Sequence, residues 1–225
     1  SHGFFQRWPS LKSILNLLKV SIPASTQQIF FSAGLTTLFY IIGLIGTAET
    51  AAAHVLINIM LVCILPGVGF GLGAASLVGQ ALGRKDEEDA YEWGMDVVKI
   101  AIIYISGIGF LLVLFPEYIL QIFLVDPITR DLAILPLQFT GLFIGLDAAG
   151  LVLMHSLSGA GDSRRVMIIS ILCQWLFFLP AAYIAGPILG VGLLGVWILQ
   201  GFYRILQASL FYGIWRTRAW AGIQL

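Results

Sequence analysis

Six long apolar runs divide this sequence, and each is long enough to cross a lipid bilayer as a helix. A transmembrane helix needs about 20 mostly apolar residues. Lipid offers the backbone no hydrogen bonds, so spanning segments satisfy them internally as helices, whereas a β-barrel would need short alternating segments. The runs therefore predict an all-α integral membrane protein with six transmembrane helices. They occupy residues 20–45, 51–82, 94–115, 132–157, 166–186 and 191–214.

The composition excludes the main alternatives to a membrane protein. Of the 225 residues, 11% are charged and 59% are hydrophobic, and the mean hydropathy is +0.94; soluble domains carry about 25% charged residues. Basic and acidic residues number 12 each, so no basic excess is available to bind nucleic acid. Cys63 and Cys173 both lie in apolar runs, which argues against a disulfide framework or a zinc site. No motif indicates an enzyme or a bound cofactor.

The distribution of Lys and Arg predicts the orientation in the membrane. Basic residues gather before the first run, in the even-numbered breaks and after the last run, whereas the odd-numbered breaks hold only Arg130. By the positive-inside rule, both termini are cytoplasmic in a multi-pass protein of the inner (plasma) membrane. We therefore divide the chain into a cytosolic lead-in or interfacial linker (1–19), a six-helix transmembrane lobe (20–218) and a cytosolic tail (219–225).

Two further features belong to the expected membrane surface. Residues 10–19 combine an apolar face with two lysines, so they form either an amphipathic helix in the interface or a simple cytosolic lead-in. Trp93, Trp215 and Trp220 fall where an interfacial aromatic belt is expected.

Asp147 stands out because it lies near the middle of the fourth apolar run. An ionised carboxylate at the bilayer centre costs about 2.5–3.5 kcal/mol on insertion scales. The side chain must therefore face water, a partner or a bound cation, or take up a proton. This makes Asp147 the candidate residue for a coupling ion, either H⁺ or Na⁺, and the metal ligand if the ion is Na⁺. The alternative is a protonated or hydrogen-bonded Asp147 with a structural role only.

Uncharged polar side chains within the runs are candidates to line a substrate cavity. Gln27 and Gln28 lie near the cytosolic start of the first run. His54 and Asn58 are four residues apart and therefore share one face of the second helix. We assign all four to the cavity.

Among the basic residues within the runs, His155 and Arg204 could act together with Asp147. His155 is two helical turns beyond Asp147, so it lines the predicted cavity and either passes protons toward the cytosol or is simply hydrogen-bonded near the interface. Arg204 lies in the sixth run and could pair with Asp147. We expect its guanidinium to reach the cytosolic headgroups instead, as long basic side chains near membrane surfaces do.

The second run combines Pro66 with closely spaced glycines. A proline beside glycines permits bending, so this run is either a helix that moves during transport or a tightly packed static one. Small residues four apart let helix backbones approach closely. Three such pairs occur: Gly67/Gly71, Gly69/Gly73 and Gly79/Gly83.

The order and spacing of these segments resemble the carboxyl-terminal lobe of a NorM-like transporter of the MATE (multidrug and toxic compound extrusion) family. The resemblance covers nearly the whole chain. Its elements are Ser21–Pro23 with Gln27 and Gln28, residues 46–54 with Asn58, residues 69–83, and Asp147 followed by residues 158–163.

This resemblance implies one lobe of a two-lobed, twelve-helix antiporter that exchanges Na⁺ or H⁺ for organic, often cationic, drugs. The implied partners are a second six-helix lobe (from the same polypeptide or a second copy), small organic substrates and membrane lipid. Asp147 would match the family's fourth-span coupling carboxylate. Where NorM-like members carry a Glu, this chain has Phe31 and Ser32, and Phe143, also assigned to the cavity, replaces a Tyr of some members. These departures favour protons over sodium.

Two other functions remain open from the sequence. A lipid-linked oligosaccharide or polysaccharide flippase of related architecture should line its cavity with several basic residues for pyrophosphate, and only Arg204 lies deep in a run. A non-transporting membrane scaffold would hold Asp147 and Arg204 as a static pair.

Overall fold

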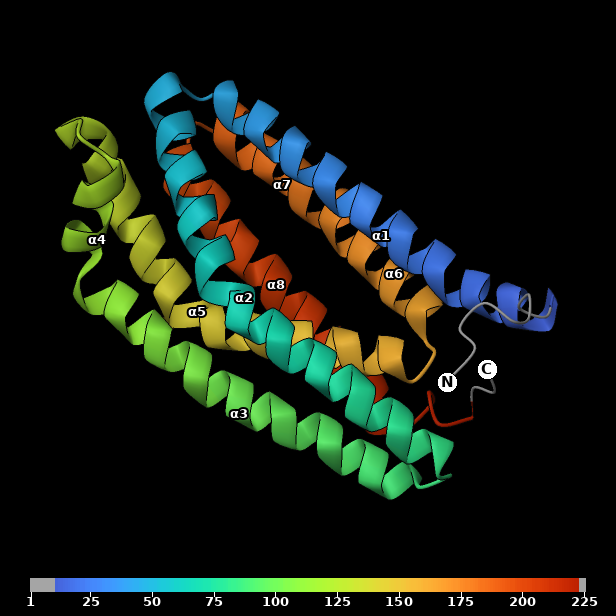
Figure 1. Cartoon of the computed structure of the whole chain (residues 1–225). Coiled ribbons are helices and arrows are strands. Elements are labelled where there is room, and N and C mark those ends of the chain that lie inside the picture. Colours follow the sequence, from blue (N-terminus) through green and yellow to red (C-terminus); the bar gives the residue numbers. More distant parts are fainter. Residues whose placement is uncertain (1–10, 223–225) are drawn as a thin grey trace, which may run out of the picture.

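Helices account for the regular structure throughout residues 11–222, the part of the chain that the computed structural model describes (Figure 1). The all-α prediction is confirmed. The segment from Ser163 to Ile188 is a single helix in which α-helical and π-helical turns alternate. The elements are α1 (Leu11–Gly43), α2 (Thr47–Gly83), α3 (Glu87–Leu114), α4 (Pro116–Phe123), α5 (Pro127–Gly159), α6 (Ser163–Ile171), η1 (Leu172–Phe178), α7 (Leu179–Tyr183), η2 (Ile184–Ile188) and α8 (Gly192–Thr217).

Four of the helices within the described residues are long and apolar enough to cross a membrane. They are α2, α3, α5 and the composite helix Ser163–Ile188. Helices α1 and α8 have 33 and 26 residues and are long enough to span, because a helix rises about 1.5 Å per residue. The chain is thus a multi-pass membrane protein, and the count of six spans stays a prediction.

Two element boundaries differ from those expected. Helix α1 begins at Leu11 and continues to Gly43, so residues 11–19 extend the first helix without a break; the rest of the expected lead-in lies outside the described residues. The expected break at 116–130 contains the short helix α4 and the first turn of α5. Both helices begin with proline, whose fixed φ angle suits the first helical position.

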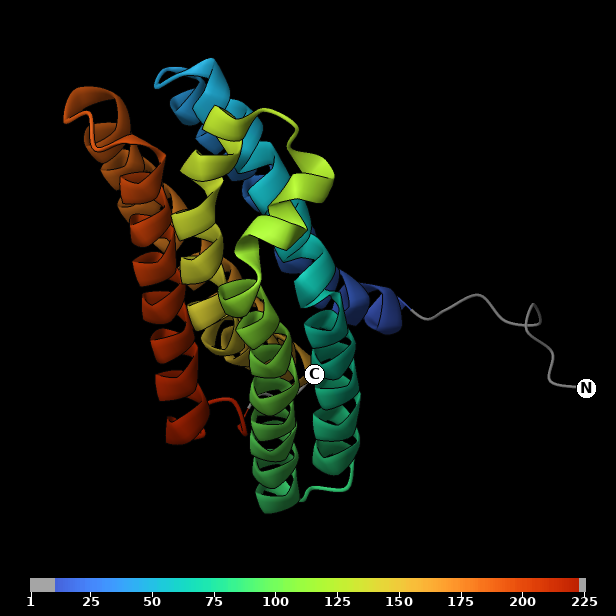
Figure 2. The same cartoon turned by 90° about the vertical axis from the view of Figure 1, so that its left-hand side faces the viewer.

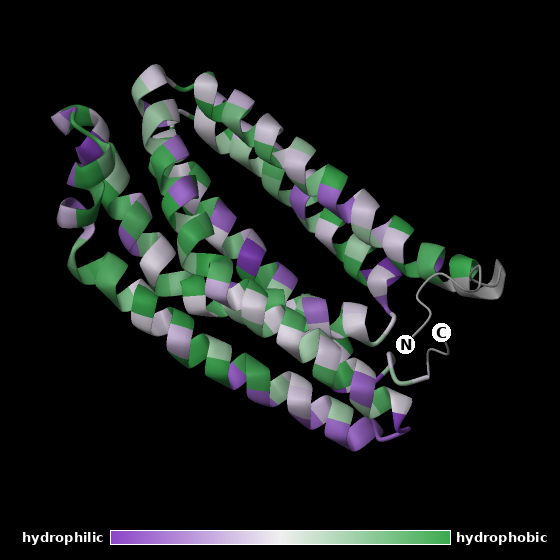
Figure 3. Cartoon of the chain, in the orientation of Figure 1, coloured by the Kyte–Doolittle hydropathy of each residue, from purple (hydrophilic) through white to green (hydrophobic). Residues whose placement is uncertain are grey.

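Carboxylates start two of the helices. The side chain of Asp86 accepts a hydrogen bond from the amide of Asp89 at 3.0 Å, and Asp126 accepts from the amide and hydroxyl of Thr129 at 2.9 and 2.6 Å. These bonds lower the pKa of Asp126, with the hydroxyl contributing most. The first turn of α3 also carries three acids next to the positive end of the helix dipole. Hydrophilic residues therefore gather at the α2–α3 turn (Figure 3).

Helix α5 lies at the centre of the bundle and packs against α2, α3 and α8 (Figures 1 and 2). It approaches α3 closely where Gly141 faces Gly109, since a Cβ atom on Gly141 would lie 2.5 Å from the Gly109 carbonyl oxygen. Gly159 faces α2 in the same way, because a Cβ there would lie 2.5 Å from the carbonyl oxygen of Ala75. The backbones can approach this closely because these positions carry no side chain.

The hydrophobic core consists mainly of two clusters stacked along the bundle. On α5 the first cluster ends at Leu137 and the second begins at Ala149. On α8 the first ends at Tyr203 and the second begins at Phe211. The interval between the clusters contains Asp147 on α5 and Arg204 on α8, together with the small cluster of Ile105, Ile144 and Ala148.

The second cluster contains two of the tryptophans expected in an aromatic belt. The side chains of Trp215 and Trp220 are fully buried and stack with their ring centres 4.3 Å apart. Their assignment to a lipid-facing aromatic belt was wrong, because Trp220 stacks on Trp215 and α3 packs against Trp215 through Tyr91 and Gly94. Trp93 remains 40% exposed.

Candidate functional site

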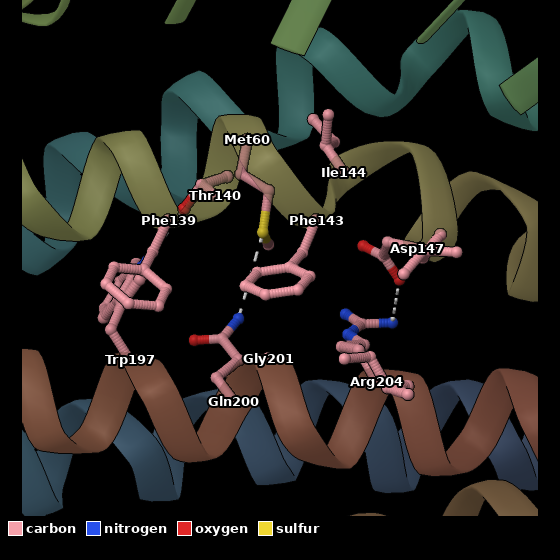
Figure 4. Close-up of a pocket in the computed structure, with 12 residues that line it drawn as sticks. Met60, Phe139, Thr140, Phe143, Ile144, Asp147, Trp197, Gln200, Gly201 and Arg204 are labelled. Carbon is pink, nitrogen blue, oxygen red and sulfur yellow. Dashed lines mark hydrogen bonds and ion pairs between the residues drawn. The ribbon is translucent and has the colours of Figure 1, made fainter. Parts of the chain in front are cut away.

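Asp147 and Arg204 face each other in the interval between the two core clusters. Asp147 projects from α5 and Arg204 from α8, and Arg204 Nη1 lies 3.3 Å from Asp147 Oδ1 (Figure 4). The two side chains are 17% and 24% exposed. The prediction that Arg204 reaches the headgroups was wrong. Because α5 packs beside α8, the carboxylate lies within reach of the guanidinium inside the bundle, and pairing the two charges offsets part of the cost of burying each.

The ion pair is loose. A charge-assisted N–H···O bond is typically about 2.7–2.9 Å long and, for arginine, often bidentate, whereas a single 3.3 Å contact joins Arg204 to Asp147. The Nε atom of Arg204 is buried without a hydrogen-bond partner among the described residues. Its guanidinium carbon lies 5.2 Å from the centre of the Tyr203 ring, close enough for a cation–π contact.

Two adjoining pockets share the pair as part of their walls. The larger has a cavity volume of about 320 Å³ and the smaller about 40 Å³, and Met60, Asp147 and Arg204 line both. The larger volume falls within the range of small-molecule sites, about 300–1,000 Å³. Its wall comes from α1, α2, α5, α8 and the composite helix, and its polar or ionisable lining residues are Gln27, Gln28, Asp147, His155, Ser170, Gln174, Tyr203, Arg204 and Gln207.

Four of the predicted site residues join Asp147 at these pockets. Gln27, Gln28 and His155 line the larger pocket, and Phe143 lines the smaller one. Gln27 donates to the hydroxyl of Ser170 at 3.1 Å and thereby bridges α1 and α6.

His155 and its neighbourhood leave the relay interpretation open. Its Nδ1 atom lies 2.9 Å from the carbonyl oxygen of Leu151, one turn earlier on α5. This bond orients the ring, and the residue lines the larger pocket. A role in passing protons stays a prediction.

His54 and Asn58 lie elsewhere. Both are exposed on α2, and neither lines the two pockets of the described chain. The His54 ring packs against Phe39 of α1, with ring centres 5.6 Å apart. Their assignment to a cavity shared with a second lobe stays a prediction.

Three glutamines at the pockets were missed by sequence reasoning. Gln200 and Gln207 flank Arg204 at i, i+4 and i+7 spacing on α8, a pattern that places all three on one helix face. This signal was present in the sequence. Gln174 lies in the π-helical turn η1 and donates to the carbonyl oxygen of Phe31 at 3.4 Å; its position depends on that irregular turn, which no sequence pattern announces.

The residues around Asp147 do not form a recognisable metal site. Within residues 11–222, no three His, Cys, Asp or Glu side chains gather where they could hold a metal ion. The charged neighbour of Asp147 is Arg204.

The chain matches the MatE family model over residues 23–184. It belongs to the MatE (MATE) family. One relative, "Probable multidrug resistance protein NorM" of Thermotoga maritima, is 30% identical over 223 residues, which cover 95% of this chain and 46% of the relative. Another, "Uncharacterized transporter YisQ" of Bacillus subtilis, is 26% identical over 204 residues, with 91% and 45% covered. This MatE chain therefore spans about half the length of these curated relatives.

Solved structures share the fold of this MatE chain. One is an outward-facing multidrug resistance MATE family transporter of the MOP superfamily, and another is a MOP superfamily transporter from Pyrococcus furiosus. Each has a TM-score of 0.87 and 22% identity, and the match covers 94% of this chain and 48% of the other. The predicted resemblance to one lobe of a MATE transporter is confirmed at the level of family and fold.

Proposed function

We propose that this chain is one lobe of a secondary active multidrug efflux transporter that exchanges H⁺ for organic, often cationic, compounds, and that Asp147 is the coupling residue. The observation that carries the proposal is the position of Asp147, inside an apolar bundle and on the wall of a 320 Å³ pocket. A relative named as a probable multidrug resistance protein supports the substrate class. A second lobe in the inner membrane, with both termini of the chain cytoplasmic, would supply the opposite wall of the transport path.

Coupling requires that ion and substrate compete for one group or favour different conformations. Asp147 is suited to this because a proton, the guanidinium of Arg204 or a bound cation can each neutralise it, and each does so at the expense of the others. Arg204 already lies 3.3 Å from the carboxylate, so Na⁺ would have to displace it. A proton needs no coordination shell, which favours H⁺ over Na⁺.

A non-transporting scaffold is the second candidate, because the Asp147–Arg204 ion pair is what that function predicts. A locked structural pair would be expected to make several short hydrogen bonds. The single long contact and the unpaired Nε atom of Arg204 favour a pair that opens. A pyrophosphate-binding flippase is less well supported, because the pockets offer one arginine beside one carboxylate.

Efflux measurements on Asp147→Asn test the proposal in the intact protein that contains this chain. We expect extrusion of a fluorescent organic cation such as ethidium to fall at least about tenfold, within the range of ordinary coupling free energies. Asp96→Asn is the matched control, since Asp96 is an exposed carboxylate that pairs with Lys99 on α3, and it should keep wild-type efflux at equal expression.

Proteoliposomes separate the coupling ions. Uptake driven by an imposed pH gradient, and not by a sodium gradient, is the expected result. Wild-type efflux by Asp147→Asn would remove the coupling role, and the absence of transport by the wild-type protein under either gradient would favour the scaffold.

A further inference from the structure

The guanidinium of Arg204 has more hydrogen-bonding capacity than the protein uses. Arginine carries five N–H donors. Here one of its nitrogens contacts Asp147, and Nε has no partner among the described residues. Asp147 likewise accepts no hydrogen bond from any residue of the described chain other than this ion-pair contact. Both charged groups therefore have unused capacity, and both line the larger pocket.

The rest of the pocket adds little charge. Among its described lining residues, the titratable or charged side chains are Asp147, Arg204, His155 and Tyr203. With Asp147 ionised and His155 neutral, the positive and negative charges cancel. The other polar groups are amides and a hydroxyl, which can donate or accept without favouring either sign: Gln27, Gln28, Ser170, Gln174 and Gln207.

This balance penalises ligands that carry a single charge. A ligand with only a positive group can approach Asp147 by displacing Arg204, which leaves a guanidinium unpaired in an apolar site. A ligand with only a negative group can approach Arg204 and leaves the carboxylate unpaired. A ligand that carries both groups compensates both charges at once.

We propose that Arg204 is a specificity-determining residue and that the pocket selects amphipathic zwitterions, with the ligand's amine bound to Asp147 and its carboxylate to Arg204. The planar fork of arginine matches a carboxylate in two parallel hydrogen bonds. Apolar side chains of α2, among them Met60, Leu61 and Ile64, line the same pocket and contact the apolar body of the ligand. The inference rests on the proposed function, in which Asp147 meets the substrate, and it adds that, among those substrates, zwitterions bind more tightly than simple cations.

The amine end keeps this class compatible with exchange. An ammonium group and a proton compete for the same carboxylate, so binding of the zwitterion displaces the proton from Asp147. The carboxylate end stays on Arg204 and does not take part in that competition.

Three ligands that share one apolar body test the inference. Naphthylalanine is the zwitterion, its methyl ester the cation and its N-acetyl derivative the anion. Binding is measured by calorimetry on the intact detergent-solubilised protein at about pH 7, between the ordinary pKa values of an imidazole and an α-amine. We expect the zwitterion to bind at least about tenfold more tightly than either singly charged ligand, as expected for one lost hydrogen-bonded charge contact.

Substitutions assign each half of this preference. Arg204→Gln removes the contact to the ligand's carboxylate, which accounts for the preference of the wild-type protein for the zwitterion over the ester. In this variant the two ligands should therefore bind within about twofold of each other. Arg204→Lys keeps the charge and should retain part of the preference. Asp147→Asn should abolish the preference for the zwitterion over the N-acetyl anion. Thermal unfolding of each variant confirms that it is folded.

Either of two results would overturn the inference. One is an ester that binds wild-type protein as tightly as the zwitterion, and the other is a full preference for the zwitterion that persists in Arg204→Gln. Proton release on ligand binding depends on Asp147, and measuring it tests the coupling role separately from the ligand preference. Arg204-dependent selection without proton-linked transport would contradict the proposed function and leave this inference standing.

Discussion

At the scale of single residues, Asp162 shows how burial affects a carboxylate outside the spans. It lies in the turn between α5 and α6 with its side chain 5% exposed, and its Oδ2 atom is 3.1 Å from Arg165 Nη1. Burial raises the pKa of Asp162 above its ordinary value, and Arg165 offsets only part of this effect. The folded chain therefore binds this proton more tightly than the unfolded chain does.

The raised pKa predicts how stability depends on pH. Protonation of Asp162 stabilises the fold below the ordinary carboxyl pKa, and this contribution is lost as the pH rises through the raised folded value. We expect the melting temperature of wild-type protein to rise relative to Asp162→Asn as the pH falls from neutrality to about 4. Thermal unfolding in detergent, followed by tryptophan fluorescence, measures the difference, with Asp96→Asn as the exposed control. A difference that is independent of pH, or that grows in the opposite direction, would contradict the expectation.

At the scale of helices, glycine positions separate close packing from open surface. Of the pairs predicted on α2, Gly71 is buried, and a Cβ atom there would lie 2.8 Å from the His155 ring. Gly69 and Gly73 are exposed and meet nothing within 4 Å in the described chain. One face of α2 thus packs closely against α5, and the other face is open. Spacing alone could not tell these faces apart, because each offers the same small-xxx-small pattern.

Two glycines of α3 provide a matched test of this packing. A methyl group on Gly109 would overlap the carbonyl oxygen of Gly141 on α5, whereas one on Gly107 would meet nothing within 4 Å. Alanine favours a helix over glycine by about 1 kcal/mol. We expect Gly109→Ala to lower the free energy of unfolding by about 1–3 kcal/mol through overpacking and Gly107→Ala to leave it unchanged or raise it slightly.

Reversible denaturation in detergent measures the two variants side by side. Equal stability of both variants would show that the close approach of α3 to α5 at Gly109 does not contribute to stability.

At the scale of the whole molecule, the described turns sort into two ends of the bundle. The α2–α3 turn, the α5–α6 turn and the end of α8 lie at one end, and the turns that follow α1, α4 and η2 lie at the other (Figure 1). The Arg and Lys of the even-numbered breaks all fall at the first end. The arrangement of turns agrees with the alternation from which the orientation was predicted, and the side of the membrane stays a prediction.

Cysteine labelling tests that orientation. In a background with Cys63→Ala and Cys173→Ala, single cysteines replace Glu87 and Arg164 at one end, or Val125 and Leu189 at the other; all four positions are exposed. A membrane-impermeant maleimide added to intact cells should label positions 125 and 189, and should label 87 and 164 only after permeabilisation. The reverse pattern would contradict the predicted cytoplasmic side.

The sequence by itself determined the class of protein, the all-α fold, the alternation of its turns and the unusual position of Asp147. These conclusions need only local hydropathy and the cost of charge in lipid, which do not depend on how helices are rotated against one another. Only the tertiary structure decided which side chains meet: Arg204 with Asp147, Trp215 with Trp220, and Gly109 with Gly141. Such contacts join residues far apart in the chain, and they follow from the packing of α5 against α3 and α8 and from the turn after α8.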